Sequence, residues 1–240
     1  MPDAIPAAAP DLVAKLALAN RILYDQGVVD GFGHVSVRHN ASPAHFLLSR
    51  NLAPALVTPG DILTFDLDGN ALDATAQRVY LERFIHGEIY RARPDVQAVV
   101  HSHSPSVIPF GVTAEVLRPV YHLAGFLGAG CARFEIRTVA GDTDLLIRDR
   151  ALGRALAEAL GERPLVLMRG HGSTVVGTSL EQAVYRAIYA ETNARLQAQA
   201  LQLGAVTYLN ETEAALAAAT NDGQVVRTWA LWARRASDRT

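Results

Sequence analysis

The chain has 240 residues, of which half are apolar and 19% are charged, and its formal net charge is -2 at pH 7. This length suits one large domain or two small ones with a full hydrophobic core. The small net charge gives no electrostatic basis for binding nucleic acid or a membrane surface. No run approaches the roughly 18 apolar residues that a membrane helix needs, and the N-terminus lacks the basic and apolar regions of a signal peptide. The single cysteine, Cys131, excludes an intramolecular disulfide, so we expect a cytoplasmic protein.

Apolar periodicity and turn residues predict the elements in chain order. We expect helices over residues 11–26, 77–92, 150–160 and 180–203, followed by two shorter helices to about residue 235. We expect strands over residues 33–38, 46–49, 62–67, 96–100, 134–138 and 164–168. The interleaving of strands and helices, without strict alternation, favours an α/β fold with a mixed sheet and helices on its faces. Without a repeat or a linker in the sequence, we expect a single domain over residues 1–240.

The segment Val99-Val100-His101-Ser102-His103 is the most informative part of the sequence. Residues two apart on an extended strand point to the same side, so both imidazoles can bind one ion at about 2.1 Å. Such a pair also occurs in cores and on surfaces without any ion, and two further features favour a metal site.

The first feature is His171, which lies between two glycines at the end of the predicted strand 164–168, where a ligand is uncrowded. The second is Glu82, on the predicted helix that leads into the His101 strand; without these histidines it would be an ordinary solvated helix residue. Three protein ligands with an open fourth position are typical of a catalytic metal site. These ligand types accept zinc, manganese, iron or cobalt.

Two more histidines are candidates for the same site. His86 lies four residues after Glu82 on one helical face, where it can orient the carboxylate, contact substrate or form a structural hydrogen bond. His122 is a candidate for acid–base catalysis, with a structural role as the alternative.

Polar residues of the first two predicted strands are candidates for substrate binding. His34, Ser36 and Arg38 share one face of the strand 33–38, and His34 can either hydrogen-bond the substrate or pack structurally. Arg38 and Arg50 can each grip a carboxylate through paired N–H donors, or serve as surface or interface residues.

These pieces together resemble the class II aldolase/adducin superfamily. The matching segments, in family order, are Gly33-His34-Val35-Ser36, Val57-Thr58-Pro59, Glu82 nineteen residues before His101-Ser102-His103, and Gly170-His171-Gly172. The resemblance extends from about residue 12 to residue 205. It implies a three-layer α/β/α fold with a central mixed, mostly antiparallel sheet, and homotetramers with active sites at subunit interfaces. It also implies one divalent metal ion per subunit bound by His101, His103 and His171, with Glu82 as the acid/base residue.

The chain departs from the sugar-phosphate aldolases of that family at their phosphate site. Those enzymes carry Asn where His34 stands and a Ser-Ser pair where Tyr80-Leu81 stands, so a phosphorylated substrate is disfavoured. Residues 31–38, 46–50, 101–110 and 117–126 resemble instead the family's decarboxylases of hydroxylated aromatic or pyridine dicarboxylates.

We therefore predict a metal-dependent carbon–carbon lyase whose substrate is a small-molecule carboxylate. In the favoured reaction, decarboxylation ortho to a ring hydroxyl, the metal stabilises charge on the ring oxygen while Glu82 supplies the replacing proton. The main alternative is an aldolase acting on a non-phosphorylated hydroxy- or keto-acid/aldehyde pair. An oxygen-dependent iron activity and a non-enzymatic scaffold like adducin are further alternatives.

Overall fold

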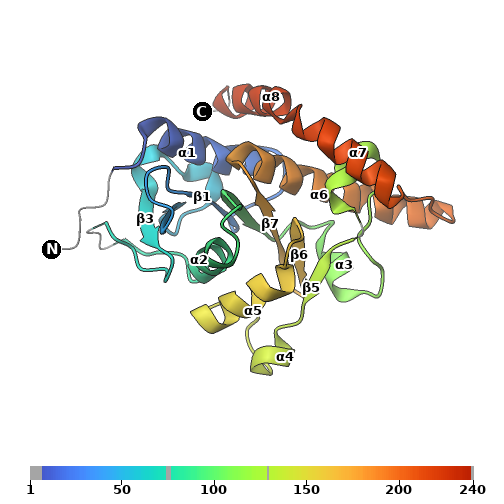
Figure 1. Cartoon of the computed structure of the whole chain (residues 1–240), viewed down its shortest axis with the longest axis horizontal. Coiled ribbons are helices and arrows are strands. Elements are labelled where there is room, and N and C mark those ends of the chain that lie inside the picture. Colours follow the sequence, from blue (N-terminus) through green and yellow to red (C-terminus); the bar gives the residue numbers. More distant parts are fainter. Residues whose placement is uncertain (1–6, 74–76, 129, 239–240) are drawn as a thin grey trace.

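One seven-stranded sheet forms the centre of the computed structural model, which describes residues 7–73, 77–128 and 130–238 (Figure 1). The strand order is β3-β2-β1-β4-β7-β6-β5, and every neighbouring pair is antiparallel except the parallel pair β5 and β6. The strands are β1 His34–Arg38, β2 His45–Ser49, β3 Ile62–Asp66, β4 Ala98–Ser102, β5 Ala132–Phe134, β6 Leu165–Met168 and β7 Gly172–Gly177.

Helices cover both faces of this sheet. In Figure 1, α1 Pro10–Asp25, α6 Leu180–Leu203 and α8 Val225–Ser237 lie above it, and α2 Arg83–Ala92 and α5 Arg150–Leu160 lie below. The remaining helices are α3 Ile108–Val112, α4 Arg137–Ala140 and α7 Glu211–Asp222, with 3-10 turns η1 Pro54–Leu56, η2 Pro59–Asp61 and η3 His122–Leu127. No helix in the described part of the chain is both long and apolar enough to cross a membrane.

Alternate residues of the central strand β4 face two separate hydrophobic cores. Ala98 and Val100 pack with the core that contains residues of α1, α6 and α8, whereas Val99 packs with the core built by α2 and α5. Because successive side chains of a strand point to opposite faces, both faces of this strand are apolar. This arrangement confirms the predicted three-layer α/β/α fold.

Strand register places the candidate histidines on the face that α2 and α5 cover. Residues directly opposite in an antiparallel pair share a face, and the register pairs His34 with His101 and Ser36 with Val99. Since Val99 faces the α2 and α5 core, His101 and His34 face the same way.

Two predicted elements differ most from the structure, while the strand predicted over residues 96–100 is shifted by two residues, to Ala98–Ser102. The helix expected over residues 77–92 begins only at Arg83, because tertiary contacts hold the preceding segment: Asn51 N–H donates to Arg78 C=O at 2.8 Å and the Tyr80 hydroxyl donates to Leu52 C=O at 2.5 Å. The strand expected over residues 134–138 ends at Phe134, after which the chain turns into α4.

Strand β7 was not predicted, since its sequence begins with glycine and two small polar residues. The close packing of β7 against β4 explains its first residue. A Cβ at Gly172 would lie 2.1 Å from the Ser102 carbonyl oxygen, so no larger residue fits without movement of a strand.

Candidate metal centre

Four side chains from separate parts of the chain converge on one point. Glu82 precedes α2, His101 lies in β4, His103 follows β4, and His171 lies in the turn between β6 and β7. Their ligand atoms all lie within 4.8 Å of one another. The structure therefore brings together all three predicted metal ligands and the predicted acid/base residue.

The separations among these atoms match the edges of a metal coordination shell. The Nε2 atom of His103 lies 3.3 Å from that of His101 and 3.0 Å from that of His171. The Glu82 Oε2 atom lies 3.5 Å from His101 Nε2 and 3.4 Å from His171 Nε2. Ligands at about 2.1 Å from a tetrahedral ion are about 3.4 Å apart, so the three imidazoles fit one divalent cation with the Glu82 carboxylate beside it.

The contacts of the distal ring nitrogens orient two of the imidazoles. His171 Nδ1 lies 3.0 Å from the Leu145 carbonyl oxygen, which only accepts, so Nδ1 carries the hydrogen and Nε2 keeps its lone pair. His101 Nδ1 lies 3.4 Å from the Thr174 hydroxyl. Both rings therefore direct Nε2 towards the point of convergence.

A short segment between α4 and α5 anchors both the carboxylate and the third histidine. The Ile147 N–H donates to Glu82 Oε1 at 2.9 Å, while the Leu145 carbonyl accepts from His171. Leu145 is the non-glycine residue with positive φ (69°) in the described structure, a strained conformation that aims its carbonyl at the histidine. Neither contact could be predicted from the sequence, because both use main-chain atoms of apolar residues.

Electrostatics favour the protonation states that a metal ligand needs. Burial raises the pKa of Glu82, but the charge of His101 and hydrogen bonds from His101 and His171 outweigh burial and hold that pKa below its ordinary value. Burial, helped by the neighbouring His101 and His171, lowers the pKa of His103 to about 4. At neutral pH the carboxylate is ionised and His103 is unprotonated, as metal binding requires.

A cavity of about 210 Å³ opens beside these ligands. Its walls include the aromatic side chains of Phe32 and Tyr80 as well as His34, and the Phe32 ring centroid lies 6.2 Å from that of His103. The lining residues are Gly31, Phe32, Gly33, His34, Asn51, Tyr80, Leu81, Glu82, His101, His103 and Leu146. Tyr80 and Asn51 were not predicted as site residues, since only the non-helical path of residues 77–82 brings them to the cavity.

The profile of the class II aldolase and adducin N-terminal domain family matches residues 14–198. The chain belongs to the class II aldolase and adducin family. The decarboxylase tropJ of Talaromyces stipitatus is 38% identical over 237 residues, which cover 89% of each chain. A 3,4-dihydroxyphthalate decarboxylase of Arthrobacter keyseri is 36% identical over 199 residues, 79% of this chain and 78% of the relative.

A solved structure of the family has the same fold. The L-fuculose 1-phosphate aldolase from Glaciozyma antarctica PI12 superposes with a TM-score of 0.73 at 26% identity, over 89% of this chain and 85% of that one. Decarboxylases and aldolases both break carbon–carbon bonds, so these relatives support a carbon–carbon lyase. Membership of the family and the Glu82–histidine group together indicate a divalent metal.

Of the predicted substrate-binding residues, His34 is the one that lines the cavity. His34 lines the cavity, with its ring centroid 5.0 Å from that of His101. His86 and Ser36 are fully buried behind it. His86 Nε2 lies 2.6 Å from His34 Nδ1, and His86 Nδ1 lies 2.6 Å from Ser36 Oγ, so both residues support His34. Neither side chain lines the cavity, and His86 forms the structural hydrogen bonds that were its alternative role. Direct contact of either residue with substrate stays a prediction.

The Arg38 side chain also contacts other parts of the protein and does not line the cavity. Within the described residues, its guanidinium donates to the main-chain carbonyl groups of Val96 at 3.0 Å, Pro43 at 2.7 Å, Tyr90 at 2.9 Å and Arg93 at 3.0 Å. These contacts tie Arg38 to the loops around β1, and its role in gripping a carboxylate stays a prediction.

Arg50 and His122 lie outside the cavity of their own chain. Arg50 donates from Nε to Asp61 at 2.6 Å, and a third of its side chain is exposed. His122 is exposed at the start of η3, where its carbonyl accepts from Asn221 at 2.8 Å. Their roles in catalysis or binding stay predictions, and for His122 they require a neighbouring subunit.

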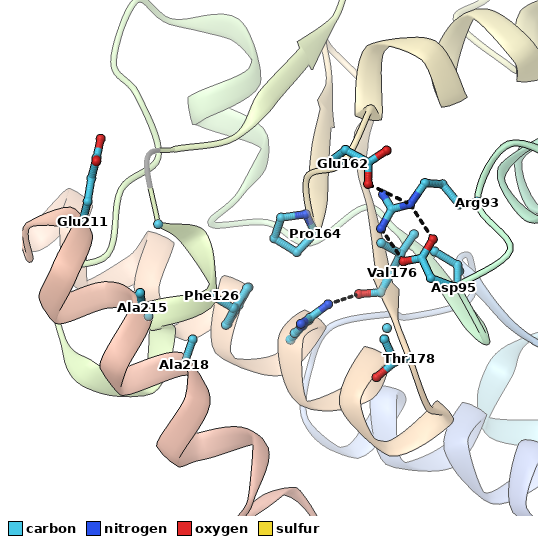
Figure 2. A pocket seen from close by; sticks show the side chains of 15 residues that line it. Arg93, Asp95, Phe126, Glu162, Pro164, Val176, Thr178, Glu211, Ala215 and Ala218 are labelled. Carbon is cyan, nitrogen blue, oxygen red and sulfur yellow. Dashed lines mark hydrogen bonds and ion pairs between the residues drawn. The ribbon is translucent and has the colours of Figure 1, made fainter.

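A second cavity, of about 590 Å³, lies apart from the metal centre of this class II aldolase family member (Figure 2). Among its charged side chains, Arg93 binds Asp95 at 2.7 Å and approaches Glu162 at 3.7 Å, and Arg186 donates to the Val176 carbonyl at 2.8 Å. None of the predicted site residues lines it.

Proposed function

We propose that this chain is a divalent-metal-dependent carbon–carbon lyase that decarboxylates a hydroxylated aromatic or heteroaromatic carboxylate. The observation that carries this proposal is the convergence of Glu82, His101, His103 and His171 at the wall of a small, partly aromatic cavity. Two decarboxylases among its relatives support the type of reaction.

The cavity supports a small ring as the substrate. Its volume of about 210 Å³ is below the roughly 300 Å³ at which pockets for drug-sized ligands begin, so it suits a single six-membered ring with short substituents. Phe32 and Tyr80 offer aromatic surfaces for such a ring. Leu81 and Tyr80 offer no anion-binding pair for a phosphate.

Glu82 is the proton carrier in the proposed mechanism. A divalent metal, when bound, supplies Lewis acidity towards a substrate oxygen. The ionised Glu82 accepts the proton of the ring hydroxyl as the substrate binds. The bond from the ring to the carboxylate then breaks, carbon dioxide leaves, and the electron pair stays with the ring. Glu82 returns the proton to the ring carbon, and the Ile147 N–H holds its other oxygen in place throughout.

A substrate panel tests this proposal. The purified protein is analysed for metals and then incubated with ortho-hydroxy aromatic acids and dicarboxylic acids, including 3,4-dihydroxyphthalate. We expect carbon dioxide release that stops on chelation and resumes when one divalent metal is restored. Release of pyruvate or glycolaldehyde from a hydroxy-acid substrate, with no carbon dioxide from any ring acid, would establish the aldolase alternative instead.

Three finer features belong to the same proposal. We propose a homotetramer with active sites at subunit interfaces; in its support, the Phe32 side chain is 70% exposed at the cavity, where a neighbouring subunit can cover it. A cytoplasmic location and the choice among zinc, manganese, iron and cobalt stay predictions.

A further inference from the structure

A chain of hydrogen bonds leads from the cavity into the interior beneath it. His34 Nδ1 lies 2.6 Å from His86 Nε2, His86 Nδ1 lies 2.6 Å from Ser36 Oγ, and Ser36 Oγ lies 2.8 Å from the Tyr90 hydroxyl. The exposed fractions of His34, His86, Ser36 and Tyr90 are 4%, 0%, 0% and 1%. Since water has almost no access, every polar hydrogen that these buried side chains share needs an acceptor among them.

The Tyr90 hydroxyl, at the buried end of these hydrogen bonds, determines which group donates in each of them. Within the described residues, the Tyr90 hydroxyl has Ser36 Oγ as its side-chain partner, and burial raises the pKa of Tyr90, so the phenol keeps its hydrogen. Tyr90 therefore donates to Ser36. The Ser36 hydrogen is left with one acceptor, His86 Nδ1. The reverse direction would leave the phenol hydrogen buried without an acceptor, which is costly.

The same reasoning then fixes both imidazoles. Because His86 Nδ1 accepts from Ser36, the hydrogen of His86 lies on Nε2 and is donated to His34 Nδ1. A doubly protonated His86 would face Ser36 with a donor and leave the serine hydrogen unpaired. Burial also lowers the pKa of His86, to about 3, in agreement with a neutral ring. With Nδ1 accepting, a neutral His34 carries its hydrogen on Nε2, the ring nitrogen left for the cavity.

We propose that His34 presents a fixed Nε2–H donor to an anionic oxygen of the substrate, and that His86 and Ser36 are positioning residues that hold it in this tautomer. The identity of the substrate rests on the proposed function, but the tautomer does not. The His34 ring lies beside that of His101, so a substrate oxygen that approached a cation held by His101, His103 and His171 would lie near this donor. A neutral N–H can stabilise such an oxygen without adding a further positive charge next to the metal.

Nitrogen-15 resonances of histidine-labelled, zinc-loaded protein test the tautomer directly. The His34 signals are assigned by their loss in His34→Gln. We expect the Nε2–H form in the wild type and a mixture of both tautomers in Ser36→Ala, which cuts the chain. Ser49→Ala, a matched change of a buried serine on the neighbouring strand β2, should leave the His34 tautomer unchanged. A wild-type His34 protonated on Nδ1 overturns the inference.

The donor role has a ligand readout and a kinetic readout. Salicylate, an ortho-hydroxy carboxylate, should move the His34 Nε2–H resonance downfield; an unmoved resonance contradicts the role. In the decarboxylation assay, His34→Phe should lower kcat/KM roughly 10²-fold, while His34→Gln, which retains an N–H donor of similar reach, should recover most of that loss. Unchanged kcat/KM in His34→Phe overturns the role. If no ring acid releases carbon dioxide, the proposed function fails while the resonances still decide the tautomer and the contact.

Discussion

At the scale of single residues, the two oxygens of Glu82 have different partners. Oε1 accepts from the Ile147 N–H, and Oε2 faces the histidines. Glu82→Gln keeps an oxygen for Ile147 but removes the ionisable group that carries the proton. We expect metal to remain bound while kcat for carbon dioxide release falls by about 10²-fold or more. Metal analysis and initial rates measure both.

A matched variant controls for loss of a buried carboxylate. Glu88 lies six residues further along, is buried, and pairs with Arg150 at 2.8 Å away from the cavity lining. Glu88→Gln should retain kcat per metal-loaded chain even where it lowers stability. Full turnover in metal-loaded Glu82→Gln would remove Glu82 from the mechanism.

The buried His86 makes stability depend on pH. Burial and the nearby His101 lower its pKa from 6.5 to about 3, so the unfolded chain binds a proton that the folded chain excludes. The contribution is complete above pH 6.5 and is lost as pH falls from 6.5 towards 3, at up to about 1.4 kcal/mol per pH unit. In urea unfolding at pH 7, 6, 5 and 4, His86→Gln should show a shallower fall than wild type. Parallel curves would contradict this assignment.

Residue spacing predicted that the three candidate ligands would converge, but it did not predict what the neighbouring polar residues contact. His101 and His103 follow from the period of a strand, and His171 from its glycine flanks. Ser36 and Arg38 share a strand face with His34, yet only His34 reaches the cavity. The difference depends on where α2 crosses that face, and this is set by packing that the strand sequence does not encode.

At the scale of elements, helix α6 supports the segment that carries His103. Its Glu191 carboxylate accepts from the Ser106 N–H at 3.0 Å and from the hydroxyls of Ser104 and Ser106. Glu191→Gln removes the charge from this three-donor site and should loosen the segment. We expect metal affinity to fall about 10- to 100-fold, as measured by competition with a chromophoric chelator.

Helix α6 also provides the control for that measurement. Glu181 lies at the N-terminal end of the helix and pairs with Lys15 on α1. Glu181→Gln should bind metal as the wild type does. Equal affinity in Glu191→Gln and wild type would show that the segment after β4 needs no support from α6.

Element boundaries were predictable where periodicity is strong and not where side chains make distant contacts. The long helix 180–203 was predicted with its observed bounds. Helix α2 starts six residues later than expected because Arg78 and Tyr80 bind residues 51 and 52. The sequence contains no local stop signal at Arg83, so this start could not be read from residues 77–92 alone.

At the scale of the whole molecule, the metal centre joins parts of the chain that are far apart in sequence. A ligand that binds only the folded state raises its stability, by about 2.7 kcal/mol at 100 times the dissociation constant. For a chain of this length we expect chelation to lower Tm by about 5–10 °C. Thermal unfolding with EDTA and with restored zinc measures the change. His171→Ala should show little response, and an equal response would place the stabilising ion elsewhere.

The three-layer architecture followed from the resemblance, and the described residues confirm it. The prediction of one domain over residues 1–240 stays a prediction, although a continuous sheet with a core on each face supports it. The oligomer is a property of surfaces between chains, which periodicity within one chain cannot predict.

The main-chain contacts of the segment from Leu145 to Ile147 limit which substitutions the candidate site can tolerate. One peptide stretch contacts the proposed acid–base residue Glu82 with an N–H and the candidate ligand His171 with a carbonyl, two residues apart. Remodelling that stretch moves both partners at once, so reactivity and cation retention are not independent traits in this fold. Directed evolution towards a new ring acid should therefore leave this stretch intact and vary the opposite wall, around Phe32 and Asn51.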